Sequence, residues 1–241
     1  MFYDERTSFP IPQIEDAGYD PYDAHFHDDT SGSIRRYVGV EIEVAGIKSE
    51  QHAIKLENCV KKWLGNIKED CSLPSSGFEI TTAPAKGDKF INQIQEICNI
   101  LRNGKAWINT KCGLHVHVDA RDLKRIDLLK TAFIWEKIED DMFKRVAPRR
   151  LTNMFCRPWK TGLIGPDIVI EKGKFDDASR QLRTKIGRSP RYASMNFTAL
   201  NAHGTLENRM HQGTLSSRKI IKWAMLNSNI LEFAKNSSLT K

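Results

Sequence analysis

Three segments of the chain alternate between apolar and polar residues, and their polar positions carry acids, imidazoles or arginine. The segments span residues 36–44, 113–119 and 204–211. A period of two predicts β-strands, because successive side chains point to opposite faces of a sheet. Side chains two residues apart then lie about 6.6 Å from each other on one face. The expected polar pairs are Glu41 with Glu43, His115 with His117, and Glu207 with Arg209, with His211 on the face of the last pair.

The rest of the body predicts further strands and helices in mixed order. Such an order favours an α+β fold, in which antiparallel strands pair and helices cover one face of the sheet. Further strands are expected over 66–71, 77–82 and 193–200, with a short one at Ile168–Glu171. Helices are expected after the caps Ser49 (ending at Gly65) and Asp88, and over 126–145 and 216–235.

Charge divides the chain into two parts. Residues 1–33 hold eight acids against one base, Arg6, together with three prolines, so we expect an irregular acidic arm. Residues 34–241 are expected to form a single catalytic domain, and they carry about +14 of charge because the whole chain carries +7. A body of this charge attracts polyanions, and ATP, nucleic acid and an acidic peptide are all candidates.

The remaining composition predicts a soluble cytoplasmic protein. No segment approaches the roughly 18 consecutive apolar residues of a membrane helix, and residues 1–8 lack the pattern of a signal peptide. Five widely spaced cysteines with no Cys-x-x-Cys pair argue against a disulfide framework and against a ribbon-type zinc site. We therefore expect reduced thiols and no membrane partner.

The acids and histidines on the strands indicate a metal site if the strands share one sheet. Glu79 adds a further carboxylate within an apolar strand. Two carboxylates about 7 Å apart repel by roughly 2 to 3 kcal/mol at an effective dielectric near 20, so a cluster of them requires protons or cations. Oxygen ligands with imidazole suit Mg²⁺ or Mn²⁺. The alternative is that each pair lies separately on a solvated face.

Four motifs together resemble the putative amidoligase family. They are Gly39-Val40-Glu41-Ile42-Glu43; Asp70-Cys71-Ser72-Leu73 followed by Gly77-Phe78-Glu79-Ile80-Thr81; Cys112-Gly113-Leu114-His115-Val116-His117-Val118-Asp119; and Gly204-Thr205-Leu206-Glu207-Asn208-Arg209 with Gly213-Thr214-Leu215. The resemblance runs from about Tyr37 to Trp223. Cys71 departs from it, because the turn usually has glycine there.

This family is similar to the carboxylate-amine ligases that share the glutamine synthetase catalytic fold, which include glutamate-cysteine ligase. The resemblance implies an antiparallel sheet curved into a half-funnel, with helices on its outer face and with ATP and two or more Mg²⁺ ions inside. It implies that the γ-phosphate of ATP passes to a substrate carboxylate, giving an acyl phosphate that an amine attacks. The ADP-forming reaction would join an amino acid, peptide, polyamine or protein lysine in an amide bond.

The resemblance also assigns roles to residues. The implied metal ligands are Glu41, Glu43, Glu79, His115 and Glu207. Contacts with nucleotide are implied for His117, Arg209 and Asn196, of which His117 could instead meet substrate. The implied catalytic residues are Arg209, at the transferring phosphate, with Glu43, Asn196 and one of Arg149 or Arg150.

Two other classes of function stay open on the sequence. A metal-dependent hydrolase or nuclease could use the same basic charge and clustered His and Glu residues on nucleic acid. A binding protein could keep the fold without turnover. A cupin-like barrel also uses His-x-His, but it expects a glutamate three to five residues later, where this chain offers only Asp119 and Asp122. The sequence predicts neither the two substrates nor the oligomeric state.

Overall fold

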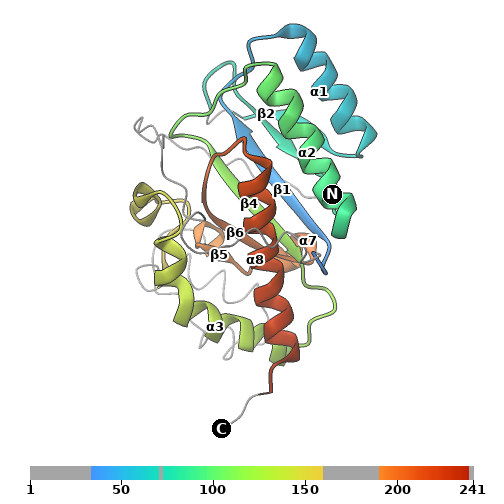
Figure 1. Ribbon diagram of the computed structural model, residues 1–241. Helices are drawn as coiled ribbons and strands as arrows, with labels where there is room; N and C mark the ends of the chain where they lie inside the picture. The colour runs from blue at the N-terminus through green and yellow to red at the C-terminus, as the bar shows by residue number, and fades with distance from the viewer. Residues whose placement is uncertain (1–33, 71–72, 160–189, 239–241) are drawn as a thin grey trace.

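Six strands form one open sheet in which every neighbouring pair is antiparallel (Figure 1). The computed structural model describes residues 34–70, 73–159 and 190–238. The strand order across the sheet is β2-β3-β1-β4-β6-β5. The strands are β1 (Val38–Val44), β2 (Asn66–Glu69), β3 (Phe78–Thr81), β4 (Gly113–Asp119), β5 (Met195–Asn196) and β6 (Thr205–Gln212).

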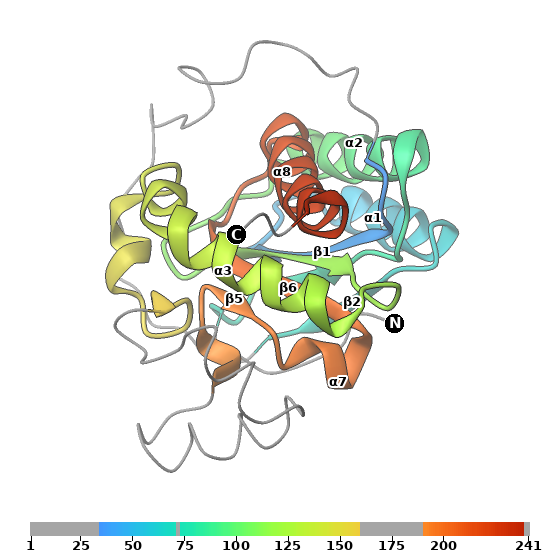
Figure 2. The same cartoon turned by 90° about the horizontal axis from the view of Figure 1, so that it is seen from below.

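Helices cover one face of this sheet. In Figure 2 the three helices α1, α2 and α8 lie above the strands, while the short helix α7 lies below them. α3 packs against α8. The predicted α+β class, with an antiparallel sheet and helices on one face, is confirmed. The helices are α1 (Glu50–Lys62), α2 (Gly87–Asn103), α3 (Arg125–Phe143), α7 (Ala199–His203) and α8 (Ser217–Asn236), with 3₁₀ turns at Pro148–Thr152 and Pro190–Tyr192.

The apolar side of the alternating strands forms the core under the helices. Val40 and Ile42 of β1 and Val116 of β4 are fully buried there, against Ile94 of α2 and Trp223 of α8. Burial of each such side chain stabilises the folded state by roughly 1.5–3 kcal/mol. This burial fixes the register, because a slip of one residue would turn the core side chains outward. The polar residues between them are thereby placed on the other face.

The structure corrects two of the predicted elements. The strand expected over 193–200 is only two residues long, because Asn196 Oδ1 accepts hydrogen bonds from the N–H and hydroxyl of Thr198 and the chain then turns into α7. Asp88 does not cap α2; the cap position is Lys86, and Asp88 lies in the first turn, where its charge favours the helix dipole. The strand expected at Ile168–Glu171 and the arm over 1–33 lie outside the described residues.

A β-bulge in β6 corrects the predicted face of His211. Leu114 pairs with His211 but Val116 pairs with Asn208, so three residues of β6 span two of β4. The extra residue reverses the alternation beyond Arg209. His211 accordingly lies on the helix side of the sheet. There the centroid of its ring is 5.2 Å from the centroid of the Trp223 ring.

The described residues also bear on the membrane and thiol predictions. None of their helices is both long and apolar enough to cross a bilayer. Cys59, Cys98, Cys112 and Cys156 are buried free thiols, and Cys71 lies outside the described residues.

Leu64, two residues after the end of α1, has a left-handed backbone conformation that suits glycine better than leucine. Gly65 N–H donates to Val60 O and Leu64 N–H to Lys61 O, both at 2.9 Å, which is a Schellman pattern. The left-handed residue is therefore Leu64, with φ of 60°, and not the predicted stop Gly65. Leu64 is 84% exposed, so its packing contributes little to stability.

We expect Leu64→Gly to raise the free energy of unfolding by about 0.5–1 kcal/mol, because a left-handed leucine costs more than the added chain entropy of glycine. Urea unfolding measures the change. The matched control is Ile54→Gly, an exposed apolar residue in the interior of α1, which should destabilise by a similar amount. A Leu64→Gly variant as unstable as Ile54→Gly would contradict the explanation.

Candidate functional site

The predicted polar residues of β1, β3, β4 and β6 lie together on the sheet face opposite the helices. Strand register places Glu41 beside His115, Glu43 beside Glu79, and His117 beside Glu207. All six side chains are buried. The alternative of separate pairs on a solvated face is therefore wrong.

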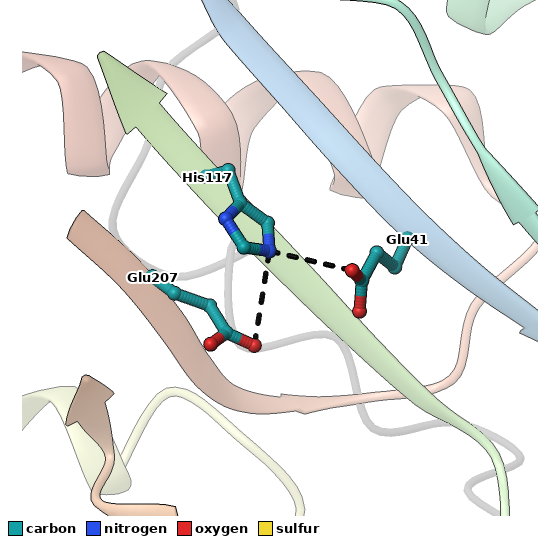
Figure 3. A group of neighbouring side chains, drawn as sticks. All are labelled: Glu41, His117 and Glu207. Atoms are coloured by element: carbon teal, nitrogen blue, oxygen red, sulfur yellow. Dashed lines mark ion pairs between the residues drawn. The ribbon is translucent and has the colours of Figure 1, made fainter. Parts of the chain in front are cut away.

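The first group of potential metal ligands is Glu41, His117 and Glu207 (Figure 3). His117 Nε2 lies 3.4 Å from Glu41 Oε1 and 3.8 Å from Glu207 Oε1, and the three potential ligand atoms lie within 4.8 Å of one another. The other ring nitrogen, Nδ1, lies 3.0 Å from Thr205 Oγ1. A contact of this kind orients a ligating imidazole, so Nε2 is held toward the two carboxylates.

The second group is Glu43, Asp70 and Glu79, whose potential ligand oxygens also lie within 4.8 Å of one another. Glu43 Oε2 accepts a hydrogen bond of 2.8 Å from Gly113 N–H. Lys68 Nζ lies 3.1 Å from Glu79 Oε1. The sequence does not predict Asp70 as a site residue. The only feature that points to it is its place at the start of the Asp70–Leu73 motif, directly after β2.

His115 lies between the two groups. Its Nδ1 is 2.8 Å from Glu41 Oε2 and 3.6 Å from Glu207 Oε1, and its Nε2 is 3.8 Å from Glu43 Oε1. The resemblance implies that His115 binds the metal and that His117 contacts nucleotide or substrate, whereas the geometry groups His117 with Glu41 and Glu207. The metal role of either imidazole stays a prediction.

Arg209 and Asn196 both contact Glu207. Arg209 Nη1 donates to one oxygen of Glu207, and Asn196 Nδ2 donates to the other at 2.8 Å. Arg209 Nε donates to Phe155 O at 3.1 Å. Its third nitrogen, Nη2, is buried and finds no hydrogen-bond acceptor among the residues that the structure describes. One guanidinium nitrogen, Nη2, is thus left for a ligand.

Of the two predicted arginines, Arg150 is the one at the site. It is buried and lines a small pocket together with Glu43 and His115. Its Nε and Nη2 donate to the backbone oxygens of Met210 and Arg209 at 2.8 and 2.6 Å. Arg149 is only partly buried and is absent from the lining of that pocket.

The two groups differ in their ionisation. Burial acts to raise the pKa of Glu41, but the hydrogen bonds and charges of His115 and His117 hold it well below its usual range. Burial and the charge of Glu79 raise the pKa of Glu43 to about 8. Burial and the charge of Glu41 raise the pKa of Glu79 to about 7, against the opposing effect of Lys68. When no cation is present, Glu43 is therefore mostly protonated at neutral pH.

These donors fit a hard divalent cation. Each group offers carboxylate oxygens, and one adds an imidazole, which is the ligand set that Mg²⁺ and Mn²⁺ accept. Glu43 Oε1 is buried and lacks a hydrogen-bond donor within the described part of the chain. A buried carboxylate oxygen with no donor is costly unless a cation or proton satisfies it.

The raised pKa of Glu43 predicts how the stability of the metal-free protein depends on pH. An unfolded glutamate ionises near pH 4.3, whereas folded Glu43 ionises near pH 8. Between these values the native state holds a proton that the unfolded state has lost, so this residue makes stability fall as pH rises. Relative to Glu43→Gln, the wild type should lose on the order of a few kcal/mol between pH 5 and 8.5.

Urea unfolding of both proteins in EDTA at the two pH values measures this difference. The Gln variant is the matched reference, because it mimics the protonated carboxyl and cannot titrate. A wild-type-minus-variant difference that stays constant with pH would contradict the assigned ionisation.

Comparison with known proteins finds one family whose model matches the chain and one solved structure that is similar to it. The model of the family described as "Putative amidoligase enzyme" matches residues 62–231, well over half of the chain; Glu41 and Glu43 precede this range. No curated protein matches the chain. Among solved structures, one titled "Crystal structure of novel glutamine synthase homolog" is similar, with a TM-score of 0.41 and 12% identity. The alignment covers 85% of this chain and 56% of the other.

Proposed function

Because the chain belongs to the putative amidoligase family, we propose that it is an ATP-dependent carboxylate-amine ligase. In the proposed reaction a substrate carboxylate oxygen bonds to the γ-phosphorus of ATP and ADP leaves. The nitrogen of an amine then bonds to the acyl carbon, inorganic phosphate leaves, and the nitrogen loses a proton. The products are an amide, ADP and phosphate.

The observation that carries this proposal is the convergence of two acidic groups and Arg209 on one buried sheet face. Transfer of a phosphoryl group to a carboxylate brings two anions together, so positive charge is needed between them. An acidic pocket suits such substrates only when cations reverse its charge. The acids are therefore explained as ligands of cations and not as contacts of the anionic substrates.

The proposed metal-binding residues are Glu41, His117 and Glu207 for one ion and Glu43, Asp70 and Glu79 for a second, with His115 between them. Bound Mg²⁺ would supply electrostatic stabilisation of the phosphates and the acceptor carboxylate. Thr205 would hold the ring of His117 in its ligating orientation.

Arg209 and Asn196 would contribute to the reaction through their own side chains. Arg209 Nη2 would donate to the oxygens of the phosphoryl group during transfer, because it is buried at the site without an acceptor among the described residues. Its charge and the amide of Asn196 would hold Glu207 in place. Asn196 is thereby a positioning residue, and the nucleotide contact predicted for it stays a prediction.

We further propose that the enzyme works in the cytoplasm and that residues 34–241 form its catalytic domain. Its carboxylate and amine substrates would be drawn from amino acids, peptides, polyamines and protein lysines.

The proposal is tested by ADP release over a panel of carboxylates and amines with ATP and Mg²⁺. We expect release that depends on both a carboxylate and an amine, with blanks lacking either one as controls. Mg²⁺-stimulated cleavage of nucleic acid without ATP would instead indicate a nuclease. Binding of ATP without ADP release over the whole panel would indicate an inactive binding protein.

A further inference from the structure

A buried carboxylate on α3 lies outside the candidate site and has no role in the proposed reaction. It belongs to Glu139, which is fully buried. A carboxylate in such a place costs free energy unless hydrogen bonds satisfy its oxygens. The groups that donate these hydrogen bonds therefore show which parts of the chain Glu139 holds together.

Three uncharged donors satisfy the Glu139 carboxylate. Trp159 N–H donates to Oε2 at 2.9 Å and to Oε1 at 3.0 Å. The Ser194 hydroxyl donates to Oε1, and Trp135 Nε1 donates to the same oxygen at 3.2 Å. Trp135 lies one turn earlier in the same helix, whereas the other two donors lie 20 and 55 residues further along the chain. The carboxylate thus ties α3 to two distant segments.

Both distant segments hold β5, the edge strand that carries Asn196. The residue directly before β5 is Ser194, whose backbone oxygen accepts a hydrogen bond of 2.9 Å from Arg209 N–H of β6. Trp159 Nε1 donates to Met195 O of β5 at 3.1 Å. Because β5 has only two residues, it forms few ladder hydrogen bonds of its own. Its position on β6 therefore depends on Ser194 and Trp159, and both are bonded to the carboxylate on α3.

The position of β5 affects the candidate site because Asn196 binds Glu207. The two residues pair in the register of β5 and β6, and Asn196 Nδ2 donates to one oxygen of Glu207 at 2.8 Å. Arg209 Nη1 donates to the other oxygen. Glu207 belongs to the first group of potential metal ligands. A displacement of β5 would thus move a potential ligand and the arginine that contacts it.

We propose that Glu139 is a positioning residue of the ligase. It fixes β5 on β6, and Asn196 of β5 then holds Glu207 in the orientation that binds the first cation, with Arg209 beside it. The proposal rests on the proposed function, which makes Glu207 a metal ligand and gives Arg209 its contact with the phosphoryl group. Glu139 itself would touch neither the cation nor the substrate. Replacing a residue that orients a metal ligand typically weakens metal binding by about 10- to 100-fold.

Metal binding measured without ATP tests this proposal. The probe is Mn²⁺, whose free concentration is followed by electron paramagnetic resonance with the wild type, Glu139→Gln and Ser194→Ala. Glutamine places an N–H group where a carboxylate oxygen accepts a hydrogen bond, and Ser194→Ala removes one donor and keeps the backbone. We expect the Kd for Mn²⁺ at the group with Glu207 to rise by about 10-fold in Glu139→Gln and by less in Ser194→Ala. Thermal unfolding checks that each variant is folded.

The matched control is Thr131→Val, which removes a buried hydroxyl of the same helix that donates to Asp127 O. It should bind Mn²⁺ as the wild type does, even where its stability falls. In an Asn196→Ala background, Glu139→Gln should raise the Kd less than in the wild type, because Asn196 carries the effect to Glu207.

Folded variants of Glu139 and Ser194 that bind Mn²⁺ with the wild-type Kd would overturn the proposal. Effects that simply add in the double variant would also overturn it, as would a wild type that binds no Mn²⁺ at millimolar concentration. Mn²⁺ binding that depends on Glu139 in a protein that never releases ADP would contradict the ligase function alone.

Discussion

Replacing Arg209 with lysine should lower ligase turnover by about 100-fold or more, the scale for losing one preorganised donor in a buried site. The affinity for ATP should change much less, because the interaction is made mainly during transfer. Lysine keeps the charge but loses the planar fork. In the wild type that fork contacts Glu207 and Phe155 O and still leaves Nη2 for the phosphoryl group. A single lysine ammonium cannot reach Glu207, Phe155 O and the phosphoryl group in the same three directions.

ADP release, KM for ATP and thermal stability measured on one preparation of Arg209→Lys separate catalysis from structure. The matched control is Arg102→Lys on the exposed side of α2, whose turnover should equal that of the wild type. Arg209 also forms a buried ion pair with Glu207, so a purely structural role is the competing explanation. That explanation predicts a destabilised variant with normal turnover per folded molecule, and this result would remove Arg209 from the catalytic residues.

The second large effect is expected when Glu41 is replaced by glutamine. Glu41 carries a full charge at neutral pH, because its pKa is held low despite burial. Glutamine keeps the shape and can still accept from His115, but it removes one anionic ligand from the group with His117 and Glu207. The variant should therefore stay folded and lose most of its response to Mg²⁺.

Binding to the native state alone stabilises a protein by about 2.7 kcal/mol when the free ligand is at 100 times Kd. If Kd rises about 100-fold, the same Mg²⁺ concentration supplies only about 0.4 kcal/mol. Thermal and urea unfolding with and without Mg²⁺ and ATP measure this loss. The control is Glu57→Gln, an exposed glutamate of α1. A Glu41→Gln protein that keeps the wild-type stabilisation would rule out Glu41 as a ligand.

The alternating segments made the centre of the site predictable. The segment 113–119 is β4 with the same bounds, and the pairs on β1 and β6 lie on its two flanks. Because alternation has a period of two, it predicts on which face of the sheet each side chain lies. The valines and leucines between the polar residues then indicate which face is buried. Sequence alone therefore identified the acids and imidazoles that share one face.

The remaining features depend on contacts that no local pattern contains. Asp70 follows a strand in irregular backbone, so no periodicity points to it. The grouping of His117 with Glu41 and Glu207 depends on the register between strands and on Thr205. No residue type in the sequence marks the β-bulge that turns His211 toward the helices.

The most direct test of the proposed reaction follows an oxygen isotope through it. The carboxylate found by the ADP-release panel is labelled with ¹⁸O and converted with ATP, Mg²⁺ and the amine. If the carboxylate attacks the γ-phosphorus, one labelled oxygen should appear in inorganic phosphate for each amide formed. Phosphate that carries no label from the carboxylate, while amide accumulates, would contradict activation through an acyl phosphate.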